Sequence, residues 1–336
     1  MAHGLTKTDM MVAVREPAWH GLGVTVDGAM TAHEAQTIAL PWRVLKKELY
    51  MEDPMEEGLF HEIPRQFATV REDTNEVLGI VGADYEPLQN DAAFKFMDAL
   101  CQDPGGPKYE TAGSLHGGRK VWMLCRMPTF IEVNGHDTVR EYLLLSNTHD
   151  GSRRVEVLWT PIRVVCQNTL SMALGGGRTG RVRFKHTGSL MGRMEEAQDI
   201  LGIARQNHQT LEDAIGYMQQ FQPTDKQTKE ILTRLYIDST DTSTSIPVLS
   251  PSQKNAIHMS THFFREGAAN KAAGDTESAW ALYNGIAEFV DYGQTMRQGR
   301  VNDPQSNRVN SNWFGQGANK KVAAFNAVMD YAMAAD

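Results

Sequence analysis

The sequence predicts an α+β fold: an antiparallel sheet of hairpins with packed helices, followed by a mostly helical carboxy-terminal region. Up to about residue 190, apolar-rich runs of strand length come in pairs separated by turn-forming residues. Beyond that point the apolar residues recur at helical spacing. The chain has 336 residues, 41% of them hydrophobic, so it is long enough to bury a substantial core. We therefore expect a nucleic-acid-binding α+β domain over 1–190 and a helical region over 191–336.

The first expected elements are a capped helix and a strand. Thr31 is suited to cap a helix that runs to about Leu40, because Glu34 stands three residues later at the capping-box position. The segment "WRVLKKELYM", residues 42–51, then alternates well enough to predict a strand.

Hairpins and a helix are expected next. Residues 65–89 place two apolar-rich runs around the turn-forming "EDTNE", and a helix capped by Asn90 or Asp91 follows. Two further pairs of strand-like runs are broken by the glycine turns "LHGGRK" at 115–120 and "HDGSRR" at 149–154. These pairs would supply most of the antiparallel sheet.

The rest of the chain is expected to be helical, with one polar loop. A short helix over 168–174 should stop at the glycine triplet that begins at Gly175. The Ser/Thr/Pro-rich stretch near 238–253 predicts a loop. Longer stretches with helical spacing cover 194–221, 225–237, 278–296 and 319–335.

Composition and segment lengths point to a cytoplasmic protein with no membrane association. No stretch approaches 18 uninterrupted apolar residues, and the first residues lack the basic-then-apolar order of a signal peptide. Cys101, Cys125 and Cys166 are widely spaced and form no CxxC pair. Free thiols in a reducing compartment are therefore expected, rather than a disulfide framework or a thiolate zinc site.

Positive charge is concentrated in one segment of an acidic chain. The formal net charge is -8, yet residues 151–193 contain eight Lys and Arg residues and a single acid, Glu156, which gives +7. The other residues must then carry -15, since -15 and +7 give -8. This asymmetry is the strongest physical signal in the sequence.

The charged segment predicts a nucleic-acid interface. Arginine presents a planar fork that suits phosphate oxygens, and aromatic rings beside basic residues form platforms on which single-stranded bases stack. If four to seven of these basic residues contact phosphates, the logarithm of the binding constant should fall with the logarithm of the salt concentration with a slope of roughly -3 to -5. The expected contact residues are Arg153, Arg154, Trp159, Arg163, Arg178, Arg181, Arg183, Phe184 and Lys185, with Arg119 and Lys120 as secondary candidates.

Other interpretations of the basic segment stay open. Such a cluster can be a solvated face, can be neutralised by acidic residues of the same molecule, or can bind a small anionic ligand. "GGGRTG", residues 175–180, lacks the lysine of a nucleotide-binding P-loop.

No motif predicts catalysis, a metal or a cofactor. His258 and His262 are four residues apart on an expected helix, but the catalytic glutamate of a zinc protease is missing between them. The histidines in the glycine-rich turns are interpreted as solvated loop residues: His20, His116, His149 and His186. We therefore expect a protein that is not an enzyme.

Several motifs together resemble a known family. "WHGLG", "VLGIVGADYEPLQNDAAFKFMDAL", "TAGSLHGGRKVWMLCRMP", "IRVVCQNTL" and "AWALYNGIAEFVDY" occur in this order. They are similar to a phage/plasmid-like family that carries a domain of unknown function. The amino-terminal layout is also similar to phage single-strand annealing proteins of the RecT, Erf and Sak kinds. That resemblance implies rings or filaments that pair complementary strands in the bacterial host cytoplasm without hydrolysing a nucleotide.

The sequence thus predicts a bacteriophage-type single-stranded DNA-binding protein, active in strand annealing during recombination or replication and assembled as a homo-oligomer. RNA in place of DNA stays open as the ligand. A first alternative is a non-enzymatic interaction protein whose basic groove receives an acidic host or phage protein. A second is a metal-dependent DNA-processing enzyme, which requires carboxylates or histidines clustered in space.

Overall fold

The fold is described from a computed structural model. It describes residues 11–14, 24–101, 108–135, 137–163, 168–169, 181–186, 194–237, 249–294, 311 and 315–334. These residues form a mixed α+β structure with two sheets and with the helices mostly in the carboxy-terminal region, as the sequence predicts.

The larger sheet has eight strands. Seven follow the order β10-β9-β8-β7-β6-β1-β2, and β11 pairs with β9 on the same edge as β10. Neighbouring strands are antiparallel except β1 and β2, which are parallel. The strands are β1 (Met11–Val14), β2 (Val24–Val26), β6 (Lys108–Leu115), β7 (Lys120–Val133), β8 (Asp137–Thr148), β9 (Val155–Arg163), β10 (Asn168–Thr169) and β11 (Arg181–Phe184).

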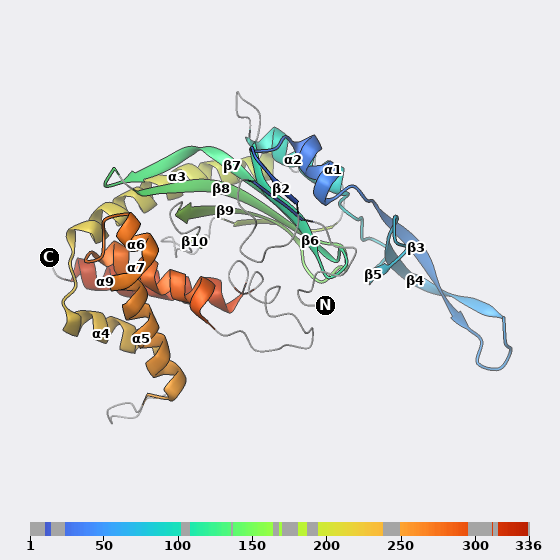
Figure 1. The fold of residues 1–336 in the computed structure, drawn as a ribbon. Helices are drawn as coiled ribbons and strands as arrows, with labels where there is room; N and C mark the ends of the chain where they lie inside the picture. The colour runs from blue at the N-terminus through green and yellow to red at the C-terminus, as the bar shows by residue number, and fades with distance from the viewer. Residues whose placement is uncertain are drawn as a thin grey trace.

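Three helices lie against this sheet (Figure 1). They are α1 (Ala32–Ala39), α2 (Asn90–Cys101) and the long α3 (Met194–Gln220). The expected capping box of α1 is present, with Thr31 and Glu34 bonding each other's backbone amides. Tyr109 on β6 ties α2 to the sheet, because its hydroxyl donates to the Asp98 carboxylate at 2.8 Å.

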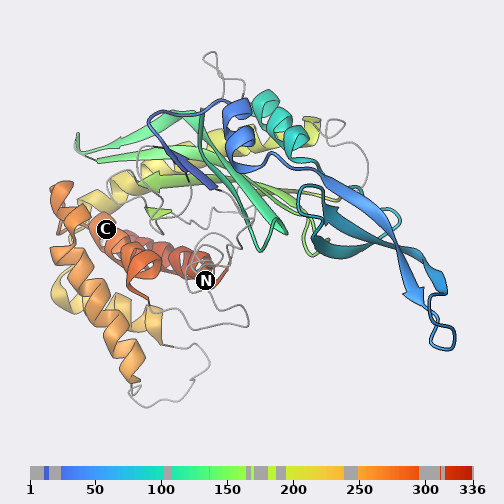
Figure 2. The same ribbon diagram turned by 45° about the vertical axis from the view of Figure 1, so that its right-hand side comes forward.

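The smaller sheet has the order β3-β4-β5 and forms an extension that projects from the body of the molecule (Figures 1 and 2). Its strands are β3 (Val44–Glu52), β4 (Phe60–Arg71) and β5 (Val77–Gly82). The expected strand at 42–51 and the expected hairpin at 65–89 are both present. Their joining into one sheet through a long β3–β4 hairpin was not predicted. We call this hairpin, residues 44–71, the arm.

The carboxy-terminal region consists of helices that pack beside the sheet (Figure 1). Within the described residues, no helix is both long and apolar enough to cross a membrane. A short π-helix, η2, continues α7 directly. The elements are α4 (Asp225–Tyr236), α5 (Pro251–Glu266), α6 (Ala268–Ala272), α7 (Ala279–Glu288), η2 (Phe289–Gly293) and α9 (Gln316–Met333).

One apolar core joins the strands and the carboxy-terminal helices, because its buried residues extend from Val12 on β1 to Val328 on α9. A second, smaller cluster, which includes Trp122 on β7 and Leu144 on β8, comes from the other side chains of the same strands, as alternation along a strand requires. Cys125 on β7 is a buried free thiol, as expected for that residue.

Two local predictions need correction. Asn168 and Thr169 were expected to begin a helix, but they form β10 opposite Arg163 and Ile162 of β9. The residues that complete this expected helix, 170–174, lie outside the described residues. The polar loop was expected to reach residue 253, yet α5 already begins at Pro251. Its capping box pairs Ser250 with Gln253, and a capping signal outweighs polar composition.

Candidate nucleic-acid interface

Three separate stretches of chain meet at one end of the larger sheet. They are the β6–β7 turn, the β8–β9 turn and the end of β11. Lys120 lies opposite Thr148 in the β7–β8 ladder, and the His149 amide donates to the Arg119 carbonyl at 2.8 Å. On the far side of β9, Phe184 lies opposite Val155, so the residue after β11 is a neighbour of the residue before β9. The sheet register therefore brings both turns and the β11 end together.

The shape of the β6–β7 turn is fixed by its contact with the smaller sheet. Gly118 has a φ of +98°, and a Cβ atom at this position would lie 2.9 Å from the ring of Trp42. The same ring lies beneath the Arg71 guanidinium, 4.5 Å from the ring centroid, and Arg71 Nη1 donates to the Gly117 carbonyl. Glycine allows this approach because it has no side chain and tolerates a positive φ.

The two turns and β11 present a group of basic residues at this sheet end. Arg119, Arg153, Arg154 and Lys185 are exposed to solvent. Arg183 is half exposed, and Lys120 is buried with 8% exposure. We call this group the strand-end basic cluster: Arg119, Lys120, Arg153, Arg154, Arg183 and Lys185.

Glu156, the single acid of the basic segment, is bracketed by two of its arginines. The Arg183 Nε donates to the Glu156 carboxylate at 2.6 Å, and an Arg181 guanidinium nitrogen lies 3.9 Å from the same oxygen. Since Arg181 and Arg183 share a buried carboxylate, part of their charge is neutralised within the protein. The other exposed cations of the cluster therefore contribute more to the positive electrostatic potential of this surface than Arg181 and Arg183 do.

Burial alters the chemistry of Lys120. Its removal from water, reinforced by the nearby charge of Arg153, lowers the pKa of Lys120 to about 7, while Glu156 and Asp150 act in the opposite direction. The ammonium group of Lys120 is therefore partly deprotonated at neutral pH, so this residue contributes less than a full positive charge there.

This shift predicts a specific dependence of stability on pH. The unfolded chain holds the Lys120 proton up to its ordinary pKa of about 10.4, whereas the folded protein releases it near pH 7. Between these values the unfolded state binds more protons, so this group makes stability rise with pH, and below about pH 7 the contribution is flat. In urea unfolding at pH 6, 7, 8 and 9, the wild type should therefore gain stability relative to Lys120→Met as the pH rises. If the free energies of unfolding of the two proteins changed with pH in parallel, the lowered pKa of Lys120 would be contradicted.

The two aromatic residues expected to stack on bases are core residues. Trp159 is 4% exposed, and its Nε1 donates to the buried Glu141 carboxylate at 3.1 Å. Phe184 is fully buried and packs edge-on against Phe96 of α2, with ring centroids 5.9 Å apart. Both rings belong to the core-facing side of their strands, so we remove them from the expected contact surface.

Two other expected contact residues cannot be placed in the cluster. Arg163 lies on β9, opposite Asn168, but its side chain is outside what the structure describes. Arg178 and the glycine triplet 175–177 lie outside the described residues. Arg181 and Arg183 belong to β11, a strand that the sequence did not predict.

Sequence reasoning missed a ring pair beside the cluster. Tyr85 and His186 are stacked, with ring centroids 4.6 Å apart. The His186 ring contacts the Arg153 carbonyl at 3.1 Å, and the Tyr85 hydroxyl donates to the Thr148 carbonyl at 2.9 Å. Burial lowers the pKa of His186 and so favours the neutral ring. The position of His186 directly after Lys185 was the signal in the sequence that could have indicated this pair.

A second turn histidine is also not the solvated residue that we expected. His149 is fully buried, lies edge-on to Trp42 and contacts the Asn90 side chain at 3.2 Å. Burial lowers the pKa of His149 to about 3, so it is neutral. Its buried ring thus anchors the start of the β8–β9 turn to Trp42 and Asn90.

The described residues contain no group of three or more His, Cys, Asp or Glu side chains that could hold a metal ion. His258 and His262 are both exposed on α5.

One comparison with known proteins gives a match. A family model described as a domain of unknown function, DUF932, matches residues 77–313. That range contains the strand-end basic cluster and begins at β5, so the arm precedes it. No curated protein and no solved structure matches the chain.

Proposed function

Because the chain belongs to the DUF932 family, whose function is unknown, we propose its function from the chemistry of its own site. The protein is a phage-type single-stranded DNA-binding protein that pairs complementary strands in recombination or replication. It acts as a homo-oligomer in the host cytoplasm and hydrolyses no nucleotide.

The observation that supports this proposal most is the gathering of exposed cations from separate segments. Arg119 belongs to one turn, Arg153 and Arg154 to another, and Lys185 follows β11, yet all four lie at the same end of the sheet. The remainder of the chain is acidic. A phosphate backbone is attracted to such a cluster and repelled from the rest of the surface, which confines binding to one place.

The Tyr85–His186 ring pair favours a single strand as the ligand. Both rings are partly exposed beside Arg153. Unpaired bases can stack on such rings, whereas the bases of a duplex are stacked on each other and present their edges. The pair takes over the role first expected of Trp159 and Phe184.

Fluorescence anisotropy with a labelled single-stranded oligonucleotide tests the proposal. Four phosphate contacts predict a log–log salt slope of about -3 for the wild type. Replacing both Arg153 and Arg154 by alanine should reduce the slope to about -1.4. It should also weaken binding roughly tenfold or more. The matched control replaces Arg65, which is 78% exposed on the arm, and Arg205, which is exposed on α3. It removes the same charge elsewhere and should bind as the wild type does.

Different results would favour different ligands. No binding of single-stranded DNA at low salt would refute the proposal, and the cluster would then fit an acidic protein partner. If the Arg153 and Arg154 variant and its control bound DNA equally well, the DNA would contact a surface other than the strand-end basic cluster. An RNA oligonucleotide of the same sequence, run in parallel, decides between the two nucleic acids, and a strand-annealing assay follows if DNA is preferred.

A further inference from the structure

The outer part of the arm is exposed on both of its faces. Among the described residues, eight of the twelve exposed large hydrophobic side chains lie on the smaller sheet or on the loop at its tip. Tyr50, Met51 and Phe60 are 54%, 55% and 58% exposed, and Met55 at the tip is 94% exposed. Monomeric proteins rarely leave so much apolar surface uncovered on one feature, so this surface fits an interaction site.

The same part of the arm has little to stabilise it within its own chain. β5 pairs with β4 between Gln66 and Val70, so the arm beyond those residues is a two-stranded ribbon. It pairs Tyr50, Met51 and Glu52 with Glu62, His61 and Phe60. An isolated two-stranded hairpin is marginally stable in water, and packing against another surface is the usual remedy.

The ribbon combines aromatic and acidic side chains on one face. Tyr50 lies opposite Glu62 and Phe60 lies opposite Glu52, and alternation places these four residues on the same side. Residues 48–62 contain six Asp and Glu residues and no Lys or Arg, which gives -6. Asp53 and Glu52 also bond the amides of Met55 and Gly58 and thereby order the tip. The negative charge of this surface repels a nucleic acid. A complementary partner surface would be positively charged and partly apolar.

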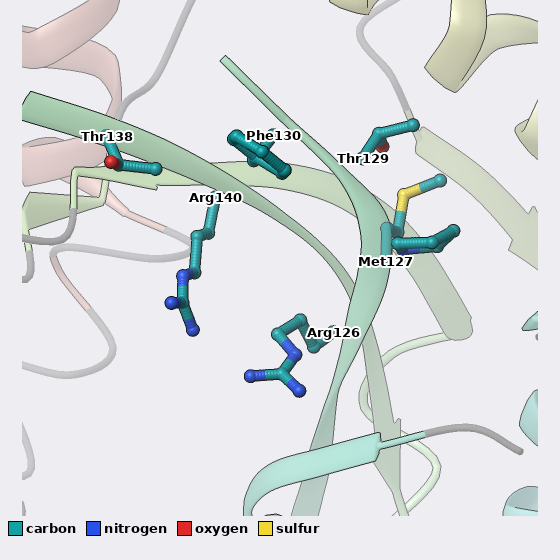
Figure 3. Close-up of a pocket in the computed structure, with 7 residues that line it drawn as sticks. Arg126, Met127, Thr129, Phe130, Thr138 and Arg140 are labelled. Carbon is teal, nitrogen blue, oxygen red and sulfur yellow. The ribbon is translucent and has the colours of Figure 1, made fainter. Parts of the chain in front are cut away.

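A surface with this complementary chemistry lies on the larger sheet. The β7–β8 hairpin contains a hollow of about 400 Å³ (Figure 3). Its lining combines two arginines with apolar side chains, and no lining residue is acidic. Arg126 pairs with Glu110 at 3.1 Å, and Phe130, which lies opposite Arg140, is 57% exposed. The lining residues are Arg126, Met127, Pro128, Thr129, Phe130, Thr138 and Arg140.

We propose that the outer arm of one copy of this chain docks in the β7–β8 hollow of a second copy. Tyr50 and Phe60 pack against Phe130 and the arginine stems, while Glu52 and Glu62 face the guanidinium groups. Arginine suits this role because its planar group both pairs with carboxylates and stacks on aromatic rings. The inference rests on the self-assembly included in the proposed function but does not depend on DNA binding.

The positions of the two surfaces determine the kind of assembly. The arm projects beyond the end of the sheet at which β7 begins (Figure 1). The residues that line the hollow lie toward the opposite end of β7, near its turn to β8. Arm and hollow are different surfaces on the same chain, so each copy can accept one neighbour and bind another. Such head-to-tail contacts generate rings or filaments rather than closed two-fold dimers.

Sedimentation velocity on the full chain tests the arrangement. The wild type should sediment as species larger than a monomer at tens of micromolar. An arm variant, Tyr50→Ser with Phe60→Ser, and a hollow variant, Phe130→Ser with Arg140→Glu, should each be monomeric alone. Mixed in equal amounts, they should form a 1:1 dimer and nothing larger, because the mixture retains one intact arm and one intact hollow per pair.

The control variant is Val77→Ser with Ile80→Ser, which removes equally exposed apolar side chains from β5. It should assemble as the wild type does, and circular dichroism should show that all variants are folded. A second arm variant, Glu52→Arg with Glu62→Arg, should also be monomeric and should regain assembly when Arg140→Glu is added.

Three outcomes would overturn the inference. They are a monomeric wild type, a hollow variant that assembles alone, and an arm variant that remains assembled. Anisotropy with a short oligonucleotide separates this result from the proposed function, because the arm variant keeps the strand-end basic cluster and should bind DNA. Loss of assembly with DNA binding intact supports the interface alone, and correct assembly without DNA binding refutes only the function.

Discussion

Replacing Lys321 by methionine should reduce the free energy of unfolding by about 3–5 kcal/mol. Lys321 on α9 has no exposed surface, and its Nζ lies 2.8 Å from a carboxylate oxygen of Asp291, which is 4% exposed on η2. Removing the ammonium group takes an ionic partner away from a buried carboxylate, and breaking a buried ion pair by deleting one member is expensive. Because the pair joins α9 to η2, which continues α7, the loss should weaken the packing of α9 against these helices.

Urea denaturation of Lys321→Met measures this loss. The control is Lys254→Met, which makes the same substitution at an exposed position on α5 and should change stability by less than about 0.5 kcal/mol. Adding Asp291→Leu to Lys321→Met should restore much of the stability, because an apolar pair can replace a buried ion pair. If the double variant were no more stable than Lys321→Met, lost packing rather than the broken ion pair would explain the effect.

Replacing Gly285 by alanine should cost about 3 kcal/mol. A Cβ atom at this position on α7 would lie 2.5 Å from the backbone nitrogen of Phe264 and 2.7 Å from its Cα, on α5. Backbone atoms cannot rotate away as a side chain can, so the two helices would have to separate across a close-packed contact. The position accepts glycine for this reason, although glycine is unfavourable within a helix.

The control for this variant is the same substitution at Gly216 on α3, where a Cβ atom would have no neighbouring atom within 4 Å outside its own helix turn. There alanine should stabilise the protein by up to about 1 kcal/mol, because it favours helix and meets no obstacle. Thermal unfolding of both variants checks the opposite signs. A stabilised Gly285→Ala would show that α5 and α7 are not in such close contact.

Local signals made much of the fold predictable. The Thr31–Glu34 capping box, the glycine turns at 115–120 and 149–154, and the helical spacing after residue 190 all correspond to observed elements. The arm was missed because the residues that join its strands are acidic and contain Pro54, which resembles a loop more than a hairpin. β11 was missed because its pairing with β9 spans a long stretch of sequence, which local patterns do not encode.

The candidate site was predictable in charge but not in detail. Counting charges located the basic segment, and the similarity of the two turns pointed to Arg119 and Lys120. Counting could not show that Glu156 pairs with Arg183, since that contact depends on strand register. Trp159 was misassigned because an aromatic residue among basic ones can face either side of a strand, and burial decides which.

The edges of the larger sheet limit how this protein can associate. One edge ends in β2, a strand of three residues, and the other edge of β9 is occupied at its two ends by β10 and β11. Long open edges recruit strands from other molecules and lead to aggregation, and short covering strands prevent this. Growth by continuing the sheet from chain to chain is therefore disfavoured. On the proposed function this protection matters, because many copies gathered on one DNA strand would reach a high local concentration that otherwise promotes irreversible β-aggregation.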